Sequence, residues 1–429
     1  MATLDMVDAD KLSQCGYFLG DVYVTDDAQG DIVLGGVNSI GGNFFVNTTQ
    51  NPSTGGLKSV SAPDLRTLEG SLRLGPHSTL QRVDLPQLNQ VLGSFLVGTV
   101  PELTELNAPA LGVFRGSFFL TDAPKLETFT LKANTTYRNE LEKAGEVRIG
   151  NVGVRNLTNV FNGFSAYSVW LANLPNLNDL TMYLGDVKYF DVAGNGRLNL
   201  TIRSLCFEKP AVHINITGVS AMNSLCTQIQ GRKFFFENNT AEVLPFWIKG
   251  LQQLRIQNNP NLRLAIPGST PFNDDWSLRE VIITDNPKLR LAQSLGADDP
   301  LVRNCDDFYK GKSSGYDTRE TWVFDWDLLE HLEIHADIEP KFFIPLTDDG
   351  FNSKTSVVVD VSIASTDPGF SCDSFNSLRS KTGFLRGEDY SCQNQTLPFG
   401  RPDDSYASST TPRTMWAVAA LAWTAAMCL

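Results

Sequence analysis

Paired carboxyl groups are the first feature of this sequence that could do chemistry. Glycoside hydrolysis uses two of them, about 5–9 Å apart, one as an acid and one as a base or nucleophile. Adjacent acidic pairs occur at Asp274-Asp275, Asp298-Asp299, Asp306-Asp307 and Asp348-Asp349. They lie in stretches rich in Gly, Pro and Asn, where Asp favours turns. We interpret them as turn or surface acids and expect no catalytic residues.

A second candidate is the segment 331–335, which reads His-Leu-Glu-Ile-His. In a strand, His331, Glu333 and His335 would share one face at intervals of about 6.8 Å, near enough to converge on a metal ion. A solvated strand face with Leu and Ile in the core explains the same pattern, and we favour that interpretation. No C-x-x-C, G-x-S-x-G, Walker or H-E-x-x-H motif occurs. We therefore expect neither metal nor cofactor, and a protein that is not an enzyme.

A repeating framework must position these side chains, and it is clearest between Leu57 and Leu131. A pattern returns there every 23 residues, with apolar residues in fixed columns and a Gly-Ser pair closing each copy. The columns are Leu57, Leu80, Leu103 and Leu126; Val60, Val83, Leu106 and Phe129; Leu65, Leu88 and Leu111; Leu68, Val91 and Phe114; and Gly-Ser at 70–71, 93–94 and 116–117. A period of about 20–29 residues is typical of a solenoid whose coils bury their apolar sides against one another.

Each coil is predicted to contain two short strands. The first ends at Pro63, Pro86 or Pro109, because proline cannot donate to a ladder. The second follows the Gly-Ser pair and alternates with a period of two, and its glycine predicts a tight bend with positive φ. Because no long stretch has a 3.6-residue period, the expected fold is all-β, a right-handed β-helix or solenoid.

The pattern loosens after Leu131 and then returns. The segments 251–262 and 278–289 both read L-x-x-L-x-L-x-x-N-x-x-L, 27 residues apart. This is close to a leucine-rich repeat, in which a buried Asn satisfies backbone groups at the turn from coil to coil. Asn259 and Asn286 occupy that position.

Four regions are expected along the chain. Residues 1–225 form a first solenoid half with a short helical cap at 8–14, because a terminal unit must hide the open end of the core. Residues 226–398 form a second half whose Ser- and Asp-rich end is a C-terminal cap. A short polar linker at 399–414 precedes a hydrophobic tail at 415–429.

The tail, residues 415–429, is apolar and uncharged, and it is short for a membrane span, which needs roughly 20 residues. Small residues, a polar spacer and an apolar terminus form the signal for a GPI anchor, with Ser405, Ala407 and Ser408 as candidate attachment sites. A hydrophobic C-terminal helix or a tail anchor is the alternative. A GPI anchor requires entry to the secretory pathway, yet residues 1–10 do not resemble a signal peptide. Either the chain is cytosolic and the tail is misleading, or the true start of the gene lies upstream, and we favour the second interpretation.

Cysteine and sequon usage favours export. Cys206 and Cys226 are about twenty residues apart, as are Cys372 and Cys392, which is a natural distance for closing a local loop with a disulfide. Candidate N-glycosylation sites are Asn47, Asn134, Asn156, Asn199, Asn215, Asn238 and Asn394. The formal charge of −13 and pI near 4.8 argue against nucleic acid or an anionic membrane surface as a partner.

The chain resembles the fungal GPI-anchored cell-wall-organisation proteins built on receptor L-domain-like repeats, distant relatives of the ligand-binding L domains of insulin- and EGF-type receptors. The resemblance rests on Asp8-Ala-Asp-Lys-Leu-Ser-Gln-Cys15, on Gly20-Asp-Val-Tyr-Val24, on the coils of 57–120 and on the tail. It implies a solenoid of receptor L-domain type, held at the outer leaflet of the plasma membrane or in the cell wall. In that family the first Cys pair surrounds the N-terminal cap, so the partner of Cys15 would lie upstream.

One outward column of the coils is a candidate binding face. If Phe118 and Leu120 point inward, the residue between them points outward, and strands about 4.8 Å apart would stack that column into a ladder. The column contains Tyr23, Phe45, Arg73, Leu96, Phe119, Arg148 and Trp170. Exposed apolar patches mark partner sites, and aromatic faces with interspersed Arg would suit a glycan or another protein. A covering loop, the N-glycans or simple stabilisation of the sheet are the alternatives.

These observations together predict a GPI-anchored cell-surface glycoprotein without catalytic activity. By resemblance it acts in fungal cell-wall organisation and integrity, and it would bind cell-wall polysaccharide or a surface protein. The alternatives are a carbohydrate-active enzyme of the β-helix class and a receptor-like module for a protein or peptide ligand.

Overall fold

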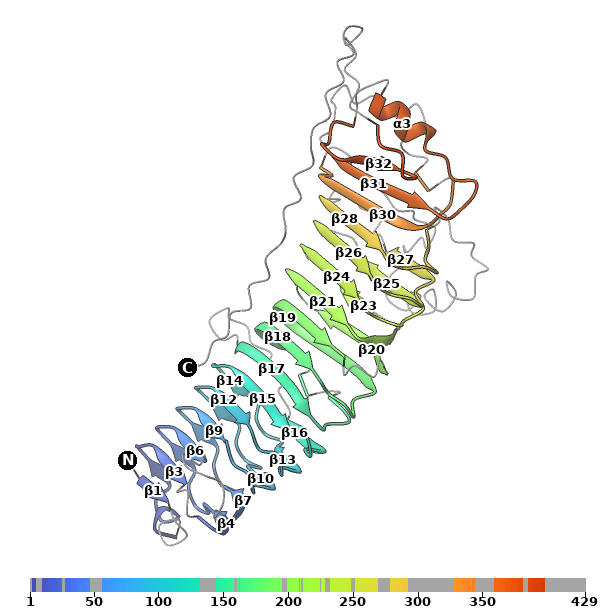
Figure 1. The fold of residues 1–429 in the computed structure, drawn as a ribbon. Helices are drawn as coiled ribbons and strands as arrows, with labels where there is room; N and C mark the ends of the chain where they lie inside the picture. Colours follow the sequence, from blue (N-terminus) through green and yellow to red (C-terminus); the bar gives the residue numbers. More distant parts are fainter. Residues whose placement is uncertain are drawn as a thin grey trace, which may run out of the picture.

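The computed structural model of the protein is an elongated stack of parallel strands (Figure 1). It describes residues 2–4, 10–24, 28–46, 56–131, 144–157, 160–161, 163–194, 199–207, 209, 211–223, 225–227, 232–247, 251–268, 278–291, 328–340, 342–343, 359–380 and 385–397. The fold is a parallel β-solenoid, which confirms the all-β solenoid predicted from the repeat.

One wall of the solenoid, the main sheet, follows the whole stack. Its strands pair in parallel in the order β1 (Ala2–Leu4), β3 (Val22–Val24), β6 (Phe44–Val46), β9 (Leu72–Leu74), β12 (Phe95–Gly98), β15 (Phe118–Ala123), β17 (Ala144–Val152), β18 (Phe164–Ala172), β19 (Asp179–Ala193), β21 (His213–Thr217), β24 (Lys233–Glu237), β26 (Gln253–Gln257), β28 (Glu280–Thr284), β30 (His331–Ile338), β31 (Asp360–Ser365) and β32 (Tyr390–Cys392).

Two further walls close the early coils. One contains β4 (Gly30–Val33), β7 (Leu57–Ser61), β10 (Arg82–Asp84), β13 (Glu105–Ala108) and β16 (Thr128–Leu131). The other contains β2 (Tyr17–Phe18), β5 (Ser39–Ile40), β8 (Thr67–Leu68), β11 (Gln90–Val91) and β14 (Val113–Phe114). These coils therefore have three strands each, and the expectation of two strands was wrong. The third wall was missed because its strands are only two residues long.

The back of the later coils is built differently. The long strand β19 runs from this back wall, where it pairs with β20 (Leu200–Phe207), into the main sheet, where it pairs with β21. The remaining back strands are β22 (Val219–Met222), β23 (Leu225–Thr227), β25 (Val243–Trp247), β27 (Leu264–Gly268) and β29 (Arg290–Leu291). The main sheet continues on both sides of residue 225, and the division into halves there stays a prediction.

The repeat columns form one hydrophobic core. Val60, Val83 and Leu106 are register partners on β7, β10 and β13 and have no exposed surface. One cluster of contacting buried side chains runs from Leu12 to Cys392. Leu12 ends a helical turn at residues 10–12, within the predicted N-terminal cap. The 23-residue period thus sets the register between coils, and this register places equivalent residues of successive coils next to one another.

The Gly-Ser pairs allow neighbouring coils to approach closely and join them by hydrogen bonds. A Cβ at Gly93 or Gly116 would lie 2.7 Å from the carbonyl carbon of the corresponding glycine one coil earlier, so no side chain fits. Neither residue has positive φ, so the expected reason for the glycine was wrong. The hydroxyl of Ser71 accepts a hydrogen bond from the backbone N–H of Ser94 at 3.0 Å, and Ser94 does the same for Ser117 at 3.1 Å.

The corner after the main sheet is made by residues in the left-handed region. They are Gly75, Thr99, Asp122, Asn151, Asn173, Gly218, Asn238, Asn258 and Asp285. Gly, Asn and Asp tolerate this backbone best. In the middle coils the side chains also form a ladder, since the Asn151 amide donates to Asp122 at 2.9 Å and the Asn173 amide donates to Asn151 at 3.2 Å.

Buried asparagines satisfy the backbone inside the later coils, as predicted for Asn259 and Asn286. The Asn259 amide donates to the carbonyls of Phe236 and of the Asn286 side chain at 3.1 and 2.9 Å. Its side-chain oxygen accepts from the backbone N–H of Asn239 at 2.9 Å. Asn239 repeats this role one coil earlier, where its oxygen accepts from Val219 N–H at 2.8 Å. All three side chains are buried.

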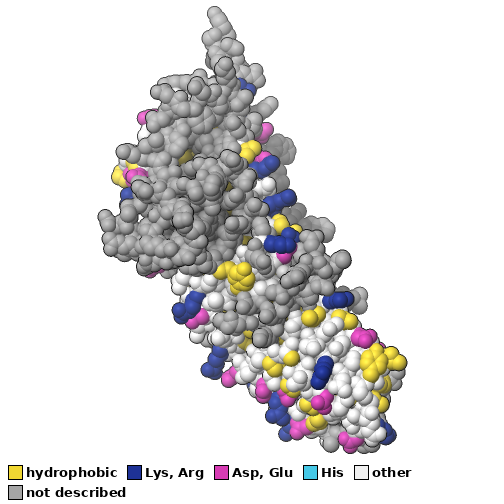
Figure 2. Space-filling model, turned by 180° about the vertical axis from the view of Figure 1, so that it is seen from behind, with side chains coloured by type: hydrophobic (Ala, Val, Ile, Leu, Met, Phe, Trp, Pro, Cys, Tyr) yellow, Lys and Arg dark blue, Asp and Glu magenta, His cyan; other side chains and the backbone are white. Residues whose placement is uncertain are grey.

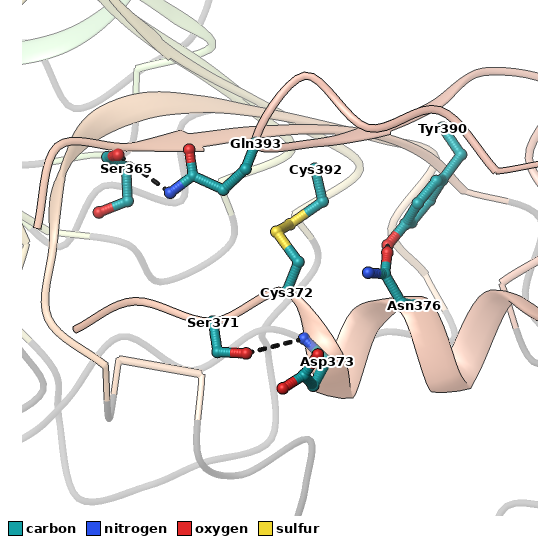
Figure 3. Close-up of a disulfide and its surroundings, with 8 residues drawn as sticks. All are labelled: Ser365, Ser371, Cys372, Asp373, Asn376, Tyr390, Cys392 and Gln393. Atoms are coloured by element: carbon teal, nitrogen blue, oxygen red, sulfur yellow. Dashed lines mark hydrogen bonds between the residues drawn. A yellow bond between two sulfur atoms is a disulfide. The ribbon is translucent and has the colours of Figure 1, made fainter. Parts of the chain in front are cut away.

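The C-terminal end of the stack is fastened by a disulfide between Cys372 and Cys392, which confirms that predicted pair (Figure 3). Cys372 immediately precedes helix α3 (Asp373–Ser380), and Cys392 ends β32. Buried Arg379 of the helix donates to the carbonyls of Leu385 and Gly387 at 2.9 and 2.7 Å. The region expected to be a cap therefore also contributes β31 and β32 to the main sheet.

We predict that Asn259→Leu lowers the free energy of unfolding by roughly 2–5 kcal/mol, because the N–H of Asn239 and the carbonyl of Phe236 lose their buried partner. Urea and thermal unfolding followed by circular dichroism measure the change. Asn261→Ala is the matched control in the same turn, since it removes only an exposed bond from Lys288 and should cost less than about 0.5 kcal/mol. Equal stability of the two variants would contradict the role of the asparagine ladder.

Candidate binding face

The main sheet has an outer face because its strands alternate. Along β15, Phe118 and Leu120 are fully buried while Phe119 between them is half-buried. The same pattern of buried, outward and buried residues recurs on β3, β6 and β9. Each strand therefore contributes one central outward residue, and the register decides which ones become neighbours.

Every residue of the predicted column is a register neighbour of the next one. The pairs run Tyr23–Phe45, Phe45–Arg73, Arg73–Leu96, Leu96–Phe119, Phe119–Arg148 and Arg148–Trp170. The sequence thus placed these side chains side by side correctly. We call this column and its continuation the central ladder.

The central ladder continues far beyond the predicted part. Its next members, each the register partner of the one before, are Asp191, Asn215, Phe235, Arg255, Ile282, Glu333, Ser362 and Ser391. Sequence reasoning missed them because the period loosens after Leu131 and β19 contains an irregular register. The phenylalanine run at 234–236, with one ring facing outward between two buried ones, was the available signal.

Two arginines in the ladder lie on aromatic rings. The guanidinium of Arg148 lies 5.7 Å from the ring centre of Phe119 and 5.1 Å from that of Trp170, so it bridges the two. The guanidinium of Arg255 lies 4.9 Å from the ring centre of Phe235. Such cation–π contacts at exposed sites contribute about 0.5–1 kcal/mol.

Carboxylates hold both arginines in place. Arg148 donates to Glu146 at 3.2 and 2.7 Å through two nitrogens, and Arg255 donates to Glu280 at 2.9 and 2.7 Å in the same way. A guanidinium fixed by a carboxylate and a ring loses little freedom when a ligand arrives. These parts of the face are therefore preorganised.

A second row of aromatic side chains lies beside the centre of the ladder. Tyr167 and Tyr189 are 58% and 37% exposed, and their ring centres are 5.2 Å apart. His213, next to Tyr189 in register, lies 6.4 Å from the Tyr189 ring and 5.0 Å, edge to face, from the ring of Phe235. The two rows together form an exposed aromatic group that the sequence did not predict.

His213 is the imidazole among these aromatic side chains. Burial lowers the pKa of its imidazole below the ordinary value of 6.5, and the nearby positive charge of Lys233 lowers it further, while Asp191 opposes the shift. The His213 Nε2 atom lies 4.0 Å from a carboxylate oxygen of Asp191. The imidazole is thus kept neutral around pH 7 and presents an uncharged edge to the face.

The His-Leu-Glu-Ile-His segment forms most of β30, with His331, Glu333 and His335 on the outer side as expected. The Nε2 atom of His331 lies 3.7 Å from Glu333, whereas His335 turns to the hydroxyl of Ser362 at 3.1 Å. Within the described part of the chain, no three His, Cys, Asp or Glu residues are grouped as a metal site. The interpretation as a solvated strand face stays the favoured one.

A separate hollow of about 570 Å³ lies at the corner of the main sheet near its C-terminal end. Its walls include Asp285, His335, Asp337, Ser365 and Thr366. It forms where β30 continues straight to Ile338 while β28 turns at Asp285. The adjacent acidic pairs predicted as turn acids, at 274–275, 298–299, 306–307 and 348–349, lie outside the described residues.

The candidate modification sites are spread over the surface. Asn156, Asn199, Asn238 and Asn394 are exposed, and Asn215 is half-buried in the central ladder. Asn47, Asn134 and the anchor candidates Ser405, Ala407 and Ser408 lie outside the described residues. Among the helices of the described part, none is long and apolar enough to cross a membrane.

Apart from the Cys372–Cys392 pair, the cysteines are disulfide-bonded, free or outside the described residues. Cys206 is disulfide-bonded, and the backbone register pairs it with Cys226, its predicted partner. Cys15 is exposed and free. Cys305 lies outside the described residues.

On the side opposite to the view of Figure 1, Lys and Arg side chains are interspersed with Asp and Glu side chains over the described surface (Figure 2). Comparison with known proteins adds no relative: no family model, no curated protein and no solved structure matches the chain. The resemblance to fungal cell-wall proteins therefore stays an expectation.

We predict that the neutral state of His213 makes stability depend on pH. A lowered pKa means that the unfolded chain binds the proton first, so stability is full above pH 6.5 and falls as the pH drops through the lowered pKa. Urea unfolding between pH 7.5 and 5 should show the wild type losing more stability than His213→Gln. If the free energy of unfolding changed with pH equally in the two proteins, His213 would not be the group responsible.

Proposed function

We propose that the protein is a GPI-anchored cell-surface glycoprotein that binds a cell-wall glycan along the outer face of its main sheet. It acts in fungal cell-wall organisation by holding polysaccharide, and it catalyses no reaction. The observation that carries the proposal is the central ladder from Phe119 to Arg255, with its flanking group of Tyr167, Tyr189 and His213.

The chemistry of the face fits sugar rings. A pyranose presents apolar C–H groups on its faces and hydroxyl groups around its edge, so it stacks on an aromatic ring while its hydroxyls need polar partners. The rings of Trp170, Tyr189 and Phe235 supply the stacking surfaces. The polar partners lie between them, as Asp191 separates Trp170 from Asn215 along the ladder.

A glycan suits this face better than a protein partner does. Arg is enriched at protein interfaces but Asp is depleted there, so Asp191 in the middle of the ladder favours a glycan. The face also follows the axis of an elongated molecule (Figure 1). A linear polymer can contact several coils in succession, each through the same column of side chains.

The surface location is supported by the sequence and by the disulfides. The polar spacer and apolar tail match a GPI signal. Cys372–Cys392 is disulfide-bonded, as is Cys206, and disulfides of this kind persist in oxidising compartments. Glycosylation at the predicted sequons follows from the same route of export.

The proposed anchor predicts release by a phosphatidylinositol-specific phospholipase. The chain is expressed in a fungal host behind a secretion signal, intact cells are treated with the phospholipase, and the medium is probed for the protein. Release is expected from the wild type, and no surface display is expected when residues 415–429 are deleted. Protein retained in the cytosol with free thiols would contradict the proposal.

The binding face predicts that Trp170→Ala and Phe235→Ala each weaken glycan binding about three- to tenfold, since each removes a stacking surface worth about 0.5–1.5 kcal/mol. Titration calorimetry with laminarihexaose and chitohexaose, on secreted protein freed of N-glycans, measures this change. Val33→Ser is the matched control, because it removes an exposed apolar side chain from a different wall. Binding that these variants leave unchanged, or the absence of binding to both oligosaccharides, would overturn the proposal.

A further inference from the structure

Asn215 differs from the other described sequons in its place in the fold. It is the central outward residue of β21, between Asp191 on β19 and Phe235 on β24. Asn238 and Asn394 instead lie at turns with positive φ, and the Asn199 amide donates to Asn178. Asn215 is therefore the one described sequon that lies in the central ladder.

The side chain of Asn215 lies on the outer face of the main sheet. Its neighbours Ile214 and Ile216 are fully buried, so the side chain must point away from the core. A sugar linked to its amide nitrogen begins one strand spacing, about 4.8 Å, from Asp191 and from Phe235. Trp170 and Arg255 follow at the next spacing on either side.

We propose that Asn215 carries an N-linked glycan whose first sugars lie on His213 and Phe235 and mask the centre of the binding face. The inference rests on the proposed export of the protein. The occupant is the chain's own carbohydrate, and the aromatic group around Asn215 provides the stacking surface for it. In the glycosylated protein, the part of the binding face from Phe119 to Trp170 stays open to an external glycan, and the sugars on Asn215 limit access to Phe235 and Arg255.

The second required residue of the sequon lies on the same face of the strand as Asn215. Thr217, the hydroxyl residue of the sequon, lies two positions along the same strand and faces the same side. Its hydroxyl donates to the Val192 carbonyl at 3.3 Å, so Thr217→Ala removes the sequon at the cost of one bond. Asn215→Gln removes the sequon at its first residue. Two independent variants therefore abolish glycosylation at this site.

The test uses full-length protein secreted from a fungal host. Glycopeptide mass spectrometry measures the fraction of Asn215 that carries a glycan. Hydroxyl-radical footprinting measures the solvent accessibility of the Tyr189, His213 and Phe235 side chains. We expect occupancy in the wild type and at least about threefold higher labelling of these residues in Asn215→Gln and in Thr217→Ala. Asn156→Gln, which removes an exposed sequon outside the ladder, should leave the labelling unchanged.

Calorimetry with laminarihexaose separates this inference from the proposed function. If both are correct, Asn215→Gln binds at least about fivefold tighter than the glycosylated wild type, because the central rings become available. If labelling of the three residues rises in Asn215→Gln but neither this variant nor the wild type binds laminarihexaose, the inference about the Asn215 glycan is supported and the proposed function is wrong. An unoccupied Asn215, or labelling that stays the same without the sequon, would overturn the inference.

Discussion

Backbone hydrogen bonds in this molecule run from coil to coil, and the rest of the structure depends on that direction. Each strand of the main sheet between β1 and β32 has its partners one coil before and one coil after it, often more than twenty residues away. Once the register is fixed, every side chain has a defined neighbour on the next coil. Core residues stack into continuous columns, and buried polar groups must find partners along the same axis.

The hydroxyls and amides inside the corners follow from this constraint. In the early coils Ser71 and Ser94, which precede strands of the main sheet, each accept a backbone N–H of the next coil. In the later coils Asn239 and Asn259, which follow strands of the main sheet, each accept a backbone N–H of the coil before. Serine suits coils in which the backbones nearly touch at the glycines. Asparagine has both a donor and an acceptor, so Asn259 binds the Phe236 carbonyl as well as the Asn239 N–H.

The sequence predicted those parts of the fold that repeat with a fixed period. Val60, Val83 and Leu106 identified the core, and the alternation around Phe119 identified the outward column, because a strand has only two faces. The two-residue strands such as β8 are too short to show an alternation. The aromatic group was missed because Tyr189 and His213 lie two positions upstream of the ladder, beyond the irregular register of β19. Their contact depends on the packing of the coils.

The core extends from Leu12 to Cys392 as a single body, with the main sheet unbroken along one side. A chain of separate domains would flex at its linkers, whereas stacked coils that share an interior resist bending at every level. Two ligands held at opposite ends of such a rod stay a set distance apart. The protein can therefore act as a rigid spacer. If one end is attached to a surface, the length of the rod sets the distance between that surface and the other end.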